Sequence, residues 1–546
     1  MLTEKRYLRY LLLAVSALLT GLTLVLPAVG FLEWLTLIGV GIFLLEMASD
    51  GSVRLRRLYG YGVFFFFCFG LVIFHWFLNL YPLEFINGMT RGAAVTVVLV
   101  AWLGLSLLQA LFGGLAFVLM GMTFRSALAR RVPFLRVFLG AGVWAVYEWT
   151  QTLGWWGVPW GRLPLGQTKY LVGLQTATIF GSYFVTFMLV SVNFCFAYAL
   201  LAFLRRKESG CGEAVRYACL TAAILLVVQY GAGTVLWFSR PTGKSENTLT
   251  MAGVQGNIAS GEKWSFSSTA KTKEVYRKYT LTAAEAGADV VVWPETALPF
   301  TIAEGNPFYD YASELAREAG VTILVGAFSE APEEKDLNYN ALICFLPDGQ
   351  MHETVYAKRR LVPFGEFVPL RGLIETLIPP LADLVLSGTE IAEGKGASVL
   401  VLEEGTFGSL ICFDSIYEEL TRDSVRDGAQ VLCLATNDSW FTDSVALDMH
   451  NAQAQLRAIE SGRYVLRAAN TGISSVISHR GEIVEKIEPH REGAVIGTVE
   501  LRTEMTPYTV LGNAFIYLLI FLLVNVFSYD VGIKVRKKYE KNMNYA

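Results

Sequence analysis

Cys412 follows a stretch that is expected to form a buried strand. The run Gly408–Ile411 is small and apolar, and it delivers a single thiol at its end. A side chain at the tip of a strand can meet substrate while sheet hydrogen bonds fix its backbone, as a nucleophile requires. Because an isolated strand cysteine is more often a small buried hydrophobe, the case for Cys412 depends on the residues that accompany it.

Two other expected strands also end in charged side chains. The β-branched run Val290–Val292 is stopped by proline, which places Glu295 just past the carboxyl end of a strand, where open α/β sheets bind ligands. Lys358 lies at the exit of a later strand, and Glu366 lies in the proline- and glycine-containing loop that follows. The sequence therefore predicts three chemically different groups at three strand ends.

A carboxylate, an ammonium group and a thiol together form a coherent set for acyl chemistry. Glu295 can take the thiol proton, Lys358 can stabilise the thiolate and the oxyanion of a tetrahedral intermediate, and the Cys412 thiolate attacks a carbonyl. Taken singly, each charged residue is more often an ordinary surface group. We predict a catalytic role for these three residues because they occur together.

These segments resemble the carbon–nitrogen hydrolase (nitrilase) superfamily. With the apolar segments described below, they are similar to its membrane-bound members, the apolipoprotein N-acyltransferases. The resemblance rests on four segments in this order: Trp293–Glu295, Lys358 with Val362–Glu366, Ile411–Asp414, and Thr436–Phe441. The family often has Tyr-Glu after the cysteine, whereas Phe413 and Asp414 stand here. A role that needs a tyrosine hydroxyl or the longer carboxylate is therefore not carried over.

The resemblance implies a fold and a set of supporting residues. It implies a four-layer αββα sandwich, with no cofactor and no metal. Trp264 is expected to help shape the acyl or head-group pocket. The full set of expected binding or supporting residues is Glu366, Trp264, Phe413, Asp414 and Trp440.

The composition indicates a membrane protein with a globular part. Of 546 residues, 53% are hydrophobic and 17% are charged, which is too apolar for a soluble enzyme of this length. The formal charge of −3 gives no indication of nucleic-acid binding. The 7 cysteines are scattered without Cys-x-x-Cys or Cys/His clusters, so we expect no metal site.

Eight apolar segments have the length of a membrane span, about 20 residues. They run near Leu11–Val29, Phe31–Met47, Tyr61–Leu80, Ala93–Met122, Val137–Trp155, Val172–Phe203, Tyr217–Trp237 and Thr509–Phe527. We expect a polytopic helical domain over residues 1–240, a catalytic domain over 241–507, and a C-terminal transmembrane helix with a basic tail over 508–546.

Lysine and arginine residues predict the orientation of these segments. They gather after the second, fourth, sixth and eighth segments, and such loops face the cytoplasm. Both termini are therefore expected in the cytoplasm, and residues 241–507 on the outer face of a bacterial plasma membrane. Within the fifth segment Glu148, with the tryptophans that follow it, indicates either an aromatic belt or a lipid-facing part of a substrate entrance.

Between Ser245 and Met505, strand-like runs alternate with helical stretches, which indicates an α/β layered domain. The helices are expected at Ser268–Ala286, Pro307–Ala319 and Ala446–Gly462. His450 is expected to be an exposed residue near the start of the last one, so a Cys–His mechanism has little support. The apolar segment Leu373–Leu386 is either core or an arm that rests on the membrane and covers the site.

The function that the resemblance implies is acyl transfer. Cys412 would take an acyl chain from a phospholipid as a thioester and pass it to the α-amino group of the diacylglyceryl-cysteine of an apolipoprotein. The expected partners are these two lipid substrates and the membrane, and we expect a monomer. The alternative is a membrane-anchored amidase or nitrilase-type hydrolase, against which eight spans count, because one anchor would suffice. A transporter with an external binding domain fits the spans but not the three strand-end residues.

Overall fold

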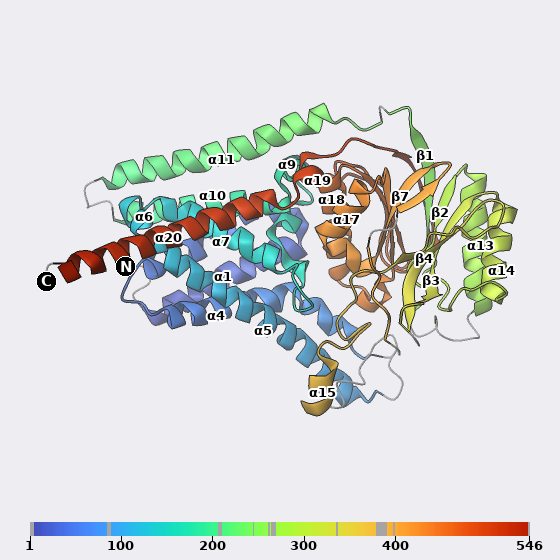
Figure 1. Ribbon diagram of the computed structural model, residues 1–546, viewed down its shortest axis with the longest axis horizontal. Helices are drawn as coiled ribbons and strands as arrows, with labels where there is room; N and C mark the ends of the chain where they lie inside the picture. The colour runs from blue at the N-terminus through green and yellow to red at the C-terminus, as the bar shows by residue number, and fades with distance from the viewer. Residues whose placement is uncertain are drawn as a thin grey trace. The chain divides into compact units, whose positions relative to one another are not determined.

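The computed structural model describes residues 5–83, 89–205, 210–243, 245–259, 263, 269–334, 337–377, 390–396 and 399–543. The chain forms two compact units. The helical unit comprises Met1–Leu78, Val98–Ser239 and Leu511–Ala546, and the α/β unit comprises Asn79–Val97 and Arg240–Val510. Figure 1 shows both units coloured along the chain.

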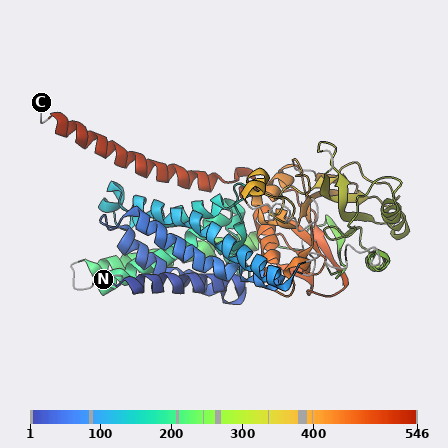
Figure 2. The same cartoon turned by 90° about the horizontal axis from the view of Figure 1, so that it is seen from below.

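The helical unit is built from long apolar helices that lie side by side (Figure 2). Within the described residues, 7 helical segments are long and apolar enough to cross a membrane. They are α1 (Arg6–Val25), the segment Pro27–Ala48 made of short helical pieces, α4 (Leu55–Ile73), α5 (Arg91–Phe124), α10 (Ser182–Leu204), α11 (Cys211–Ser239), and Ala514–Lys537 of α20 (Ala514–Met543).

Two of the predicted spans are shorter in the structure. The predicted span Val137–Trp155 corresponds to α7, Leu135–Thr150, whose 16 residues would extend about 24 Å, less than the roughly 30 Å of a bilayer core. The predicted span Val172–Phe203 becomes a continuous helix only at Ser182, because Gly181 has a φ of 76° that interrupts the α-helix. Helix α7 nevertheless packs against α10 and α20 inside the unit.

The hypothesis of a substrate entrance requires Glu148 to face lipid, and the structure contradicts it. Its side chain is buried in the helical unit, where it accepts hydrogen bonds from the backbone N–H of Leu163 (3.1 Å) and from Thr186 Oγ1 (2.5 Å). Trp160 is buried as well. Polar groups within a membrane domain are stabilised by such internal partners, so this segment contributes to helix packing.

The α/β unit contains two six-stranded sheets. The first has the order β12-β1-β2-β3-β4-β5 and the second the order β11-β10-β9-β8-β7-β6. The strands of the first are β1 (Thr248–Gln255), β2 (Val290–Val292), β3 (Thr322–Glu330), β4 (Asn338–Phe345), β5 (Tyr356–Ala357) and β12 (Gly493–Glu500). Those of the second are β6 (Val399–Leu402), β7 (Gly405–Ile411), β8 (Val431–Thr436), β9 (Tyr464–Ala469), β10 (Ser474–Ile477) and β11 (Ile483–Ile487).

The two sheets pack face to face between two layers of helices. Strand β2 shows why, because its residues alternate: Val291 packs in the core that includes α13 (Thr269–Glu285) and α14 (Pro307–Ala319), whereas Val290 and Val292 pack against the second sheet. Helices α17 (Glu418–Arg426) and α18 (Ala446–Ser461) cover the other sheet (Figure 1). The expected αββα sandwich is confirmed.

Helix α14 has the bounds that the sequence predicted. The side chain of Asn306 accepts hydrogen bonds from the first free backbone N–H groups, Pro307 occupies the first turn, and Gly320 closes the helix in the left-handed conformation. Helix α17 and strand β11, in contrast, were not predicted. The short α17 lies beside β7 and supports the strand that leads to Cys412.

Gly326 on β3 has no room for a side chain. A Cβ atom there would lie 2.0 Å from the carbonyl oxygen of Pro294, next to Glu295. We expect Gly326→Ala to lower the free energy of unfolding by about 1–3 kcal/mol, the usual cost of overpacking. Thermal unfolding of the purified protein measures this. Gly372→Ala, where a Cβ meets nothing within 4 Å, is the matched control, and equal melting temperatures for both variants would contradict the packing argument.

Candidate active site

The predicted strand-end residues Glu295, Lys358 and Cys412 lie at the ends of β2, β5 and β7 in the α/β unit. Lys358 Nζ is 2.8 Å from Glu295 Oε1, and both side chains are buried. The Cys412 thiol is partly buried and lies in the electrostatic field of both residues. The fold therefore brings together three groups that are far apart in the sequence.

Glu366 shares the same ammonium group. Its Oε1 is 2.8 Å from Lys358 Nζ. Asn340 Nδ2 donates to Oε1 of both carboxylates, at 2.7 Å to Glu295 and 3.1 Å to Glu366. Sequence reasoning missed Asn340, which stands before the apolar run Ala341–Phe345 of β4 and looks like its neighbour Asn338 in the sequence. Lysine and asparagine together allow two carboxylates to lie close to each other in a buried site.

The remaining carboxylate oxygens are held by backbone N–H groups. The N–H of Asn437 donates to Glu295 Oε2, and the N–H of Val362 donates to Glu366 Oε2, both at 2.9 Å. Charge-assisted bonds of this kind fix orientation as well as charge. Both carboxylates are thus held in one position before substrate binds.

Lys263 is a second buried lysine that the sequence analysis did not single out. Its Nζ donates to the backbone carbonyl of Glu295 (2.9 Å) and to Thr296 Oγ1 (2.7 Å). Burial lowers the pKa of Lys263 to about 7, although Glu295 opposes that shift. Thr296 has a left-handed φ of 46°, and Lys263 holds the main chain at this point, next to the Glu295 carboxylate.

Asp414 ties the nucleophile turn to the lysine strand. Its buried carboxylate accepts hydrogen bonds from the N–H of Ile411 (3.0 Å), the N–H of Arg360 (2.8 Å) and the hydroxyl of Tyr356 (2.9 Å). Burial raises the pKa of Asp414 to about 6, while Lys358 opposes the shift. The aspartate carboxylate, although shorter than the glutamate that the family often has here, therefore joins the turn after β7 to the residues around Lys358.

Of the other predicted supporting residues, the structure describes Phe413 and Trp440. Phe413 is half-buried, with its ring centroid 5.5 Å from that of Tyr417. Trp440 is half-buried in the short helix that follows β8. Trp264 lies outside the described residues, and so does the second part of the Leu373–Leu386 segment; its first part belongs to α15, Arg371–Leu377, where Leu373 is exposed.

The prediction for His450 was wrong. The residue is buried in α18, with Nδ1 2.9 Å from Asp438 Oδ1 and Nε2 3.2 Å from the carbonyl oxygen of Cys412. Its position near a helix start suggested exposure, but α18 packs against β9 and against the turn Cys412–Ile416, which bury the imidazole ring.

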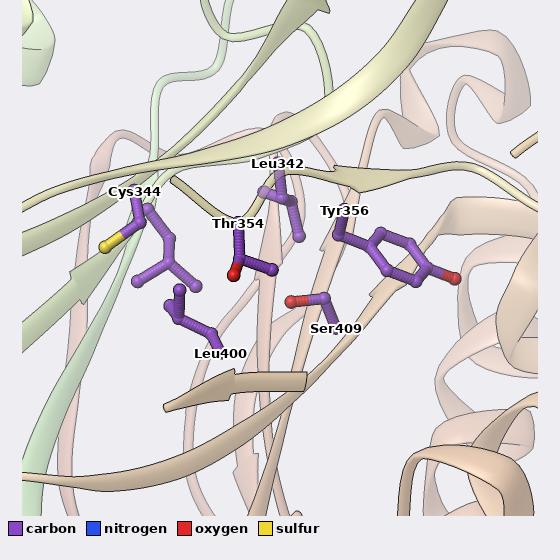
Figure 3. Close-up of a pocket in the computed structure, with 7 residues that line it drawn as sticks. Leu342, Cys344, Thr354, Tyr356, Leu400 and Ser409 are labelled. Carbon is purple, nitrogen blue, oxygen red and sulfur yellow. The ribbon is translucent and has the colours of Figure 1, made fainter. Parts of the chain in front are cut away.

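A small cavity lies between the two sheets (Figure 3). Its volume is about 10 Å³, roughly enough for one water molecule and too small for any part of a lipid. Residues from both sheets line it: Leu324, Leu342, Cys344, Thr354, Tyr356, Leu400 and Ser409. In Figure 3 the Tyr356 ring points away from Cys344 and Leu400. The cavity is a feature of the packing between the sheets.

Comparison with known proteins agrees with this architecture. Residues 250–506 match the family model for carbon–nitrogen hydrolases, and residues 16–195 match that for the N-terminal domain of apolipoprotein N-acyltransferases. The apolipoprotein N-acyltransferase of Gloeobacter violaceus is 30% identical over 501 residues, which cover 91% of this chain and 89% of the relative. That of Methylococcus capsulatus is 31% identical over 472 residues, or 85% of each chain.

The chain belongs to the apolipoprotein N-acyltransferase family. Among solved structures, the nitrilase-superfamily protein Nit3 of Saccharomyces cerevisiae aligns with 47% of this chain and 92% of its own, with 19% identity and a TM-score of 0.37. The family model and the curated relatives extend over both the apolar helices and the α/β unit, so the membership concerns the whole chain.

In this member of the apolipoprotein N-acyltransferase family, the buried pair is charged. Burial by itself would raise the pKa of Glu295, but Lys358 outweighs burial and lowers that pKa. In the same way, burial opposes the charge on Lys358, while Glu295 and Glu366 raise its pKa well above the ordinary value. At neutral pH, Lys358 is therefore an ammonium group and Glu295 a carboxylate. Among the described residues, no cluster of His, Cys, Asp and Glu has the arrangement of a metal site.

The thiol itself is protonated at rest. Burial raises the pKa of Cys412 well above that of an ordinary thiol, Glu295 adds to the shift, and Lys358 opposes it. Because the thiolate is the reactive form of a cysteine, a reaction at this sulfur requires the proton to leave, and Glu295 and Lys358 are charged groups beside it.

We expect alkylation of Cys412 by iodoacetamide to keep accelerating above pH 9, whereas an ordinary thiol with a pKa of about 8.5 levels off there. Glu295→Gln removes a negative charge beside the sulfur and so lowers the thiol pKa, and we expect this variant to alkylate faster than the native protein at pH 8. Peptide mass spectrometry gives the rate at Cys412 alone. If the alkylation rate of the native protein levels off below pH 9, the conclusion that burial and Glu295 raise the thiol pKa is contradicted.

Proposed function

We propose that this protein transfers an acyl chain from a membrane phospholipid to the α-amino group of the N-terminal diacylglyceryl-cysteine of an apolipoprotein. The observation that carries the proposal is the buried Lys358 ammonium, 2.8 Å from each of two carboxylates, beside a thiol at a strand end. Family membership adds the substrate class, because the curated relatives are named apolipoprotein N-acyltransferases.

The first half of the reaction forms a thioester. The Cys412 sulfur attacks the ester carbonyl of the phospholipid while the thiol proton passes to Glu295, and Lys358 stabilises the oxyanion. When the tetrahedral intermediate collapses, the carbon–oxygen bond breaks and Glu295 returns the proton to the departing alkoxide. The products are a lysophospholipid and an acyl group on Cys412.

The second half transfers that acyl group to nitrogen. The acceptor amine attacks the thioester in its neutral form, which is well populated near neutral pH because an α-amino group has a pKa of about 8. Lys358 again stabilises the oxyanion, the carbon–sulfur bond breaks, and the proton lost by nitrogen passes through Glu295 to the thiolate. Glu366 supports this cycle by keeping Lys358 charged and in position.

The apolar helices of this protein suit an acyl donor that is a membrane phospholipid. An acyl donor that stays in the bilayer requires an enzyme embedded there, and 7 described segments are long and apolar enough to span it. A membrane-anchored amidase would need only one. The proposal includes the division into residues 1–240, 241–507 and 508–546, a monomeric state, a location in the bacterial plasma membrane, an outward-facing catalytic domain and two cytoplasmic termini.

Phospholipid alone should acylate the enzyme. In single turnover we expect one equivalent of lysophospholipid and a hydroxylamine-labile acyl adduct on Cys412, measured by intact mass, and a diacylated lipopeptide should then discharge the adduct to its amine. Cys412→Ala should form no adduct, and Glu295→Gln and Lys358→Met should lower the acylation rate by at least about 100-fold, the usual size of general acid–base effects.

Lys395→Met is the matched control, since it removes an exposed lysine in the same unit whose ion pair with Glu333 is solvent-accessible. It should acylate at the native rate. Release of lysophospholipid only after lipopeptide is added would favour direct transfer in a ternary complex and remove Cys412 as the covalent carrier.

Single cysteines should report the orientation. We expect Lys395→Cys in the α/β unit and Arg536→Cys in α20 to react differently with a membrane-impermeant maleimide in intact cells; their native side chains are 68% and 82% exposed. The first should be labelled, and the second only after the membrane is opened, in a background from which all 7 native cysteines have been removed. Labelling in the reverse order would place the site in the cytoplasm and rule out the proposed acceptor.

A further inference from the structure

Asn470 joins the two sheets close to Glu295, and it has no part in the reaction proposed above. It directly follows β9 and is fully buried. Its backbone N–H donates to the carbonyl oxygen of Thr436, the last residue of β8, at 3.1 Å. The main chain of Asn470 is therefore fixed at the carboxyl ends of β8 and β9 in the second sheet, and its side chain bonds to residues that follow β1 of the first sheet.

The side-chain amide of Asn470 is paired with the backbone of Ile258. Its Oδ1 accepts from the N–H of Ile258 at 3.1 Å, and its Nδ2 donates to the carbonyl oxygen of the same residue at 2.7 Å. The backbone carbonyl of Asn470 also accepts from the N–H of Asn257 at 2.8 Å. A flipped amide would place two donors against each other at the Ile258 N–H, so the pairing fixes the orientation of the amide. Three hydrogen bonds from one residue thus hold the chain after β1.

The segment held in this way is strained, and it continues to Lys263. Asn257 has a left-handed φ of 49°, a conformation that persists only where the surroundings support it. The N–H of Lys263 donates to the carbonyl oxygen of Ala259 at 3.0 Å, so the turn that carries this lysine begins at the end of the held segment. Lys263 Nζ in turn donates to the backbone carbonyl of Glu295 at 2.9 Å. Asn470 therefore supports the main chain of Glu295 through this segment.

The second hydrogen of the same amide acts on the carboxylate of Glu295. Asn470 Nδ2 donates to Asn437 Oδ1 at 3.0 Å, and the N–H of Asn437 donates to Glu295 Oε2 at 2.9 Å. Asn437 is buried, and its Oδ1 also accepts from Ser439 Oγ at 2.9 Å. Because two donors hold this side chain, the backbone N–H of the same residue keeps its direction toward the carboxylate.

The direction of that N–H affects the chemistry of Glu295. A hydrogen bond to an ionised carboxyl group favours the ionised form and lowers the pKa of the group. Such a bond weakens steeply when donor and acceptor are misaligned. The N–H of Asn437 therefore helps to keep Glu295 ionised, and able to take up a proton, only while it points at Oε2.

We propose that Asn470 is a positioning residue for Glu295. It aims the N–H of Asn437 at the carboxylate, and it holds the segment that places Lys263 against the Glu295 main chain. The proposal rests on the proposed role of Glu295 as the base, but its test uses an activated ester and needs no phospholipid. Because Asn470 is uncharged and acts through other residues, its loss should change how well Glu295 reacts and should not change how well the ester binds.

The test measures acylation of Cys412 by a p-nitrophenyl ester in the full-length protein. Nitrophenol released in the first turnover gives the rate at each ester concentration, and peptide mass spectrometry locates the acyl group. Asn470→Leu removes the amide at nearly the same volume and adds no charge. We expect it to lower the maximal acylation rate by about 10- to 100-fold, as misplacement of a reacting group does, with little change in the ester concentration at half-maximal rate.

The pH dependence of this rate separates positioning from a simple loss of stability. Glu295 must be ionised to accept the thiol proton, so the rate falls as the pH drops through the pKa of Glu295. Loss of the aligned N–H raises that pKa, and we expect the acid limb of the Asn470→Leu profile to move to higher pH by about one unit. A variant that is only less stable contains less active protein and keeps the midpoint of the native profile.

A double variant tests the link through Asn437. Asn437→Ala removes the amide oxygen that Asn470 contacts and keeps the backbone N–H that contacts Glu295. If Asn470 acts through this oxygen, the two substitutions damage the same link, and the combined loss of rate is smaller than the product of the two single losses. Single losses that multiply in full would contradict the proposal.

Gln455→Met is the matched control. Gln455 is buried in α18, and its Nε2 donates to the carbonyl oxygen of Gly481, between β10 and β11, at 2.7 Å. The substitution removes a buried side-chain amide from the same unit and should leave the rate and the acid limb at their native values. Thermal unfolding of each variant shows whether the fold is retained, and Asn470→Ser replaces Asn470→Leu if the leucine variant does not fold.

An Asn470→Leu variant with the native maximal rate and the native acid limb would overturn the proposal. If the nitrophenyl ester acylates Cys412 and the variant differs as expected, but phospholipid forms no thioester with the native protein, the proposed lipid substrate fails while the positioning role stands. Normal thioester formation from phospholipid in both the native protein and the variant removes Asn470 and leaves the acyl transfer intact.

Discussion

The buried ammonium group of Lys358 is the interaction on which the site depends. Two carboxylates lie 2.8 Å from it, and without it their repulsion in a medium of low polarity would be costly. Asn340 bridges the same two oxygens and strengthens the arrangement. Because the three charges are fixed by the fold, the groups that we propose as base and oxyanion donor are in place before any substrate arrives, which would reduce reorganisation during the reaction.

The same constraint explains the connections around the site. Glu295 and Lys358 follow strands of one sheet and Cys412 a strand of the other, so the reactive geometry depends on how the two sheets pack. Asp414 links them by accepting bonds from the cysteine turn and from the residues around Lys358. Leu342, Tyr356, Ile411 and Ala435 form a small apolar core at the same junction. Packing and catalysis are therefore coupled here.

Burial raises the pKa of the Cys412 thiol, so the resting thiol is a poor nucleophile on its own. Such low reactivity at rest suits a membrane acyltransferase. The thiolate exists only when a carbonyl is present to receive it, so the resting enzyme resists oxidation and adventitious alkylation. In the proposed reaction, Lys358 lowers the cost of forming the thiolate at that moment, and Glu295 takes up the proton.

The sequence by itself predicted the apolar helical segments, the alternation of strands and helices, and the charged or thiol residues at three strand ends, because these are local properties of the chain. It predicted the αββα sandwich through family resemblance, the bounds of α14, and the residue types at the ends of β2, β5 and β7. Only the tertiary structure decided which polar residues accompany them. Asn340, Lys263 and His450 look ordinary along the chain, and the partners of their side chains lie 12 to 45 residues away. Likewise, Glu148 reads as a membrane-surface residue until Leu163 and Thr186 are seen to bond it, because burial depends on neighbours that sequence order does not reveal.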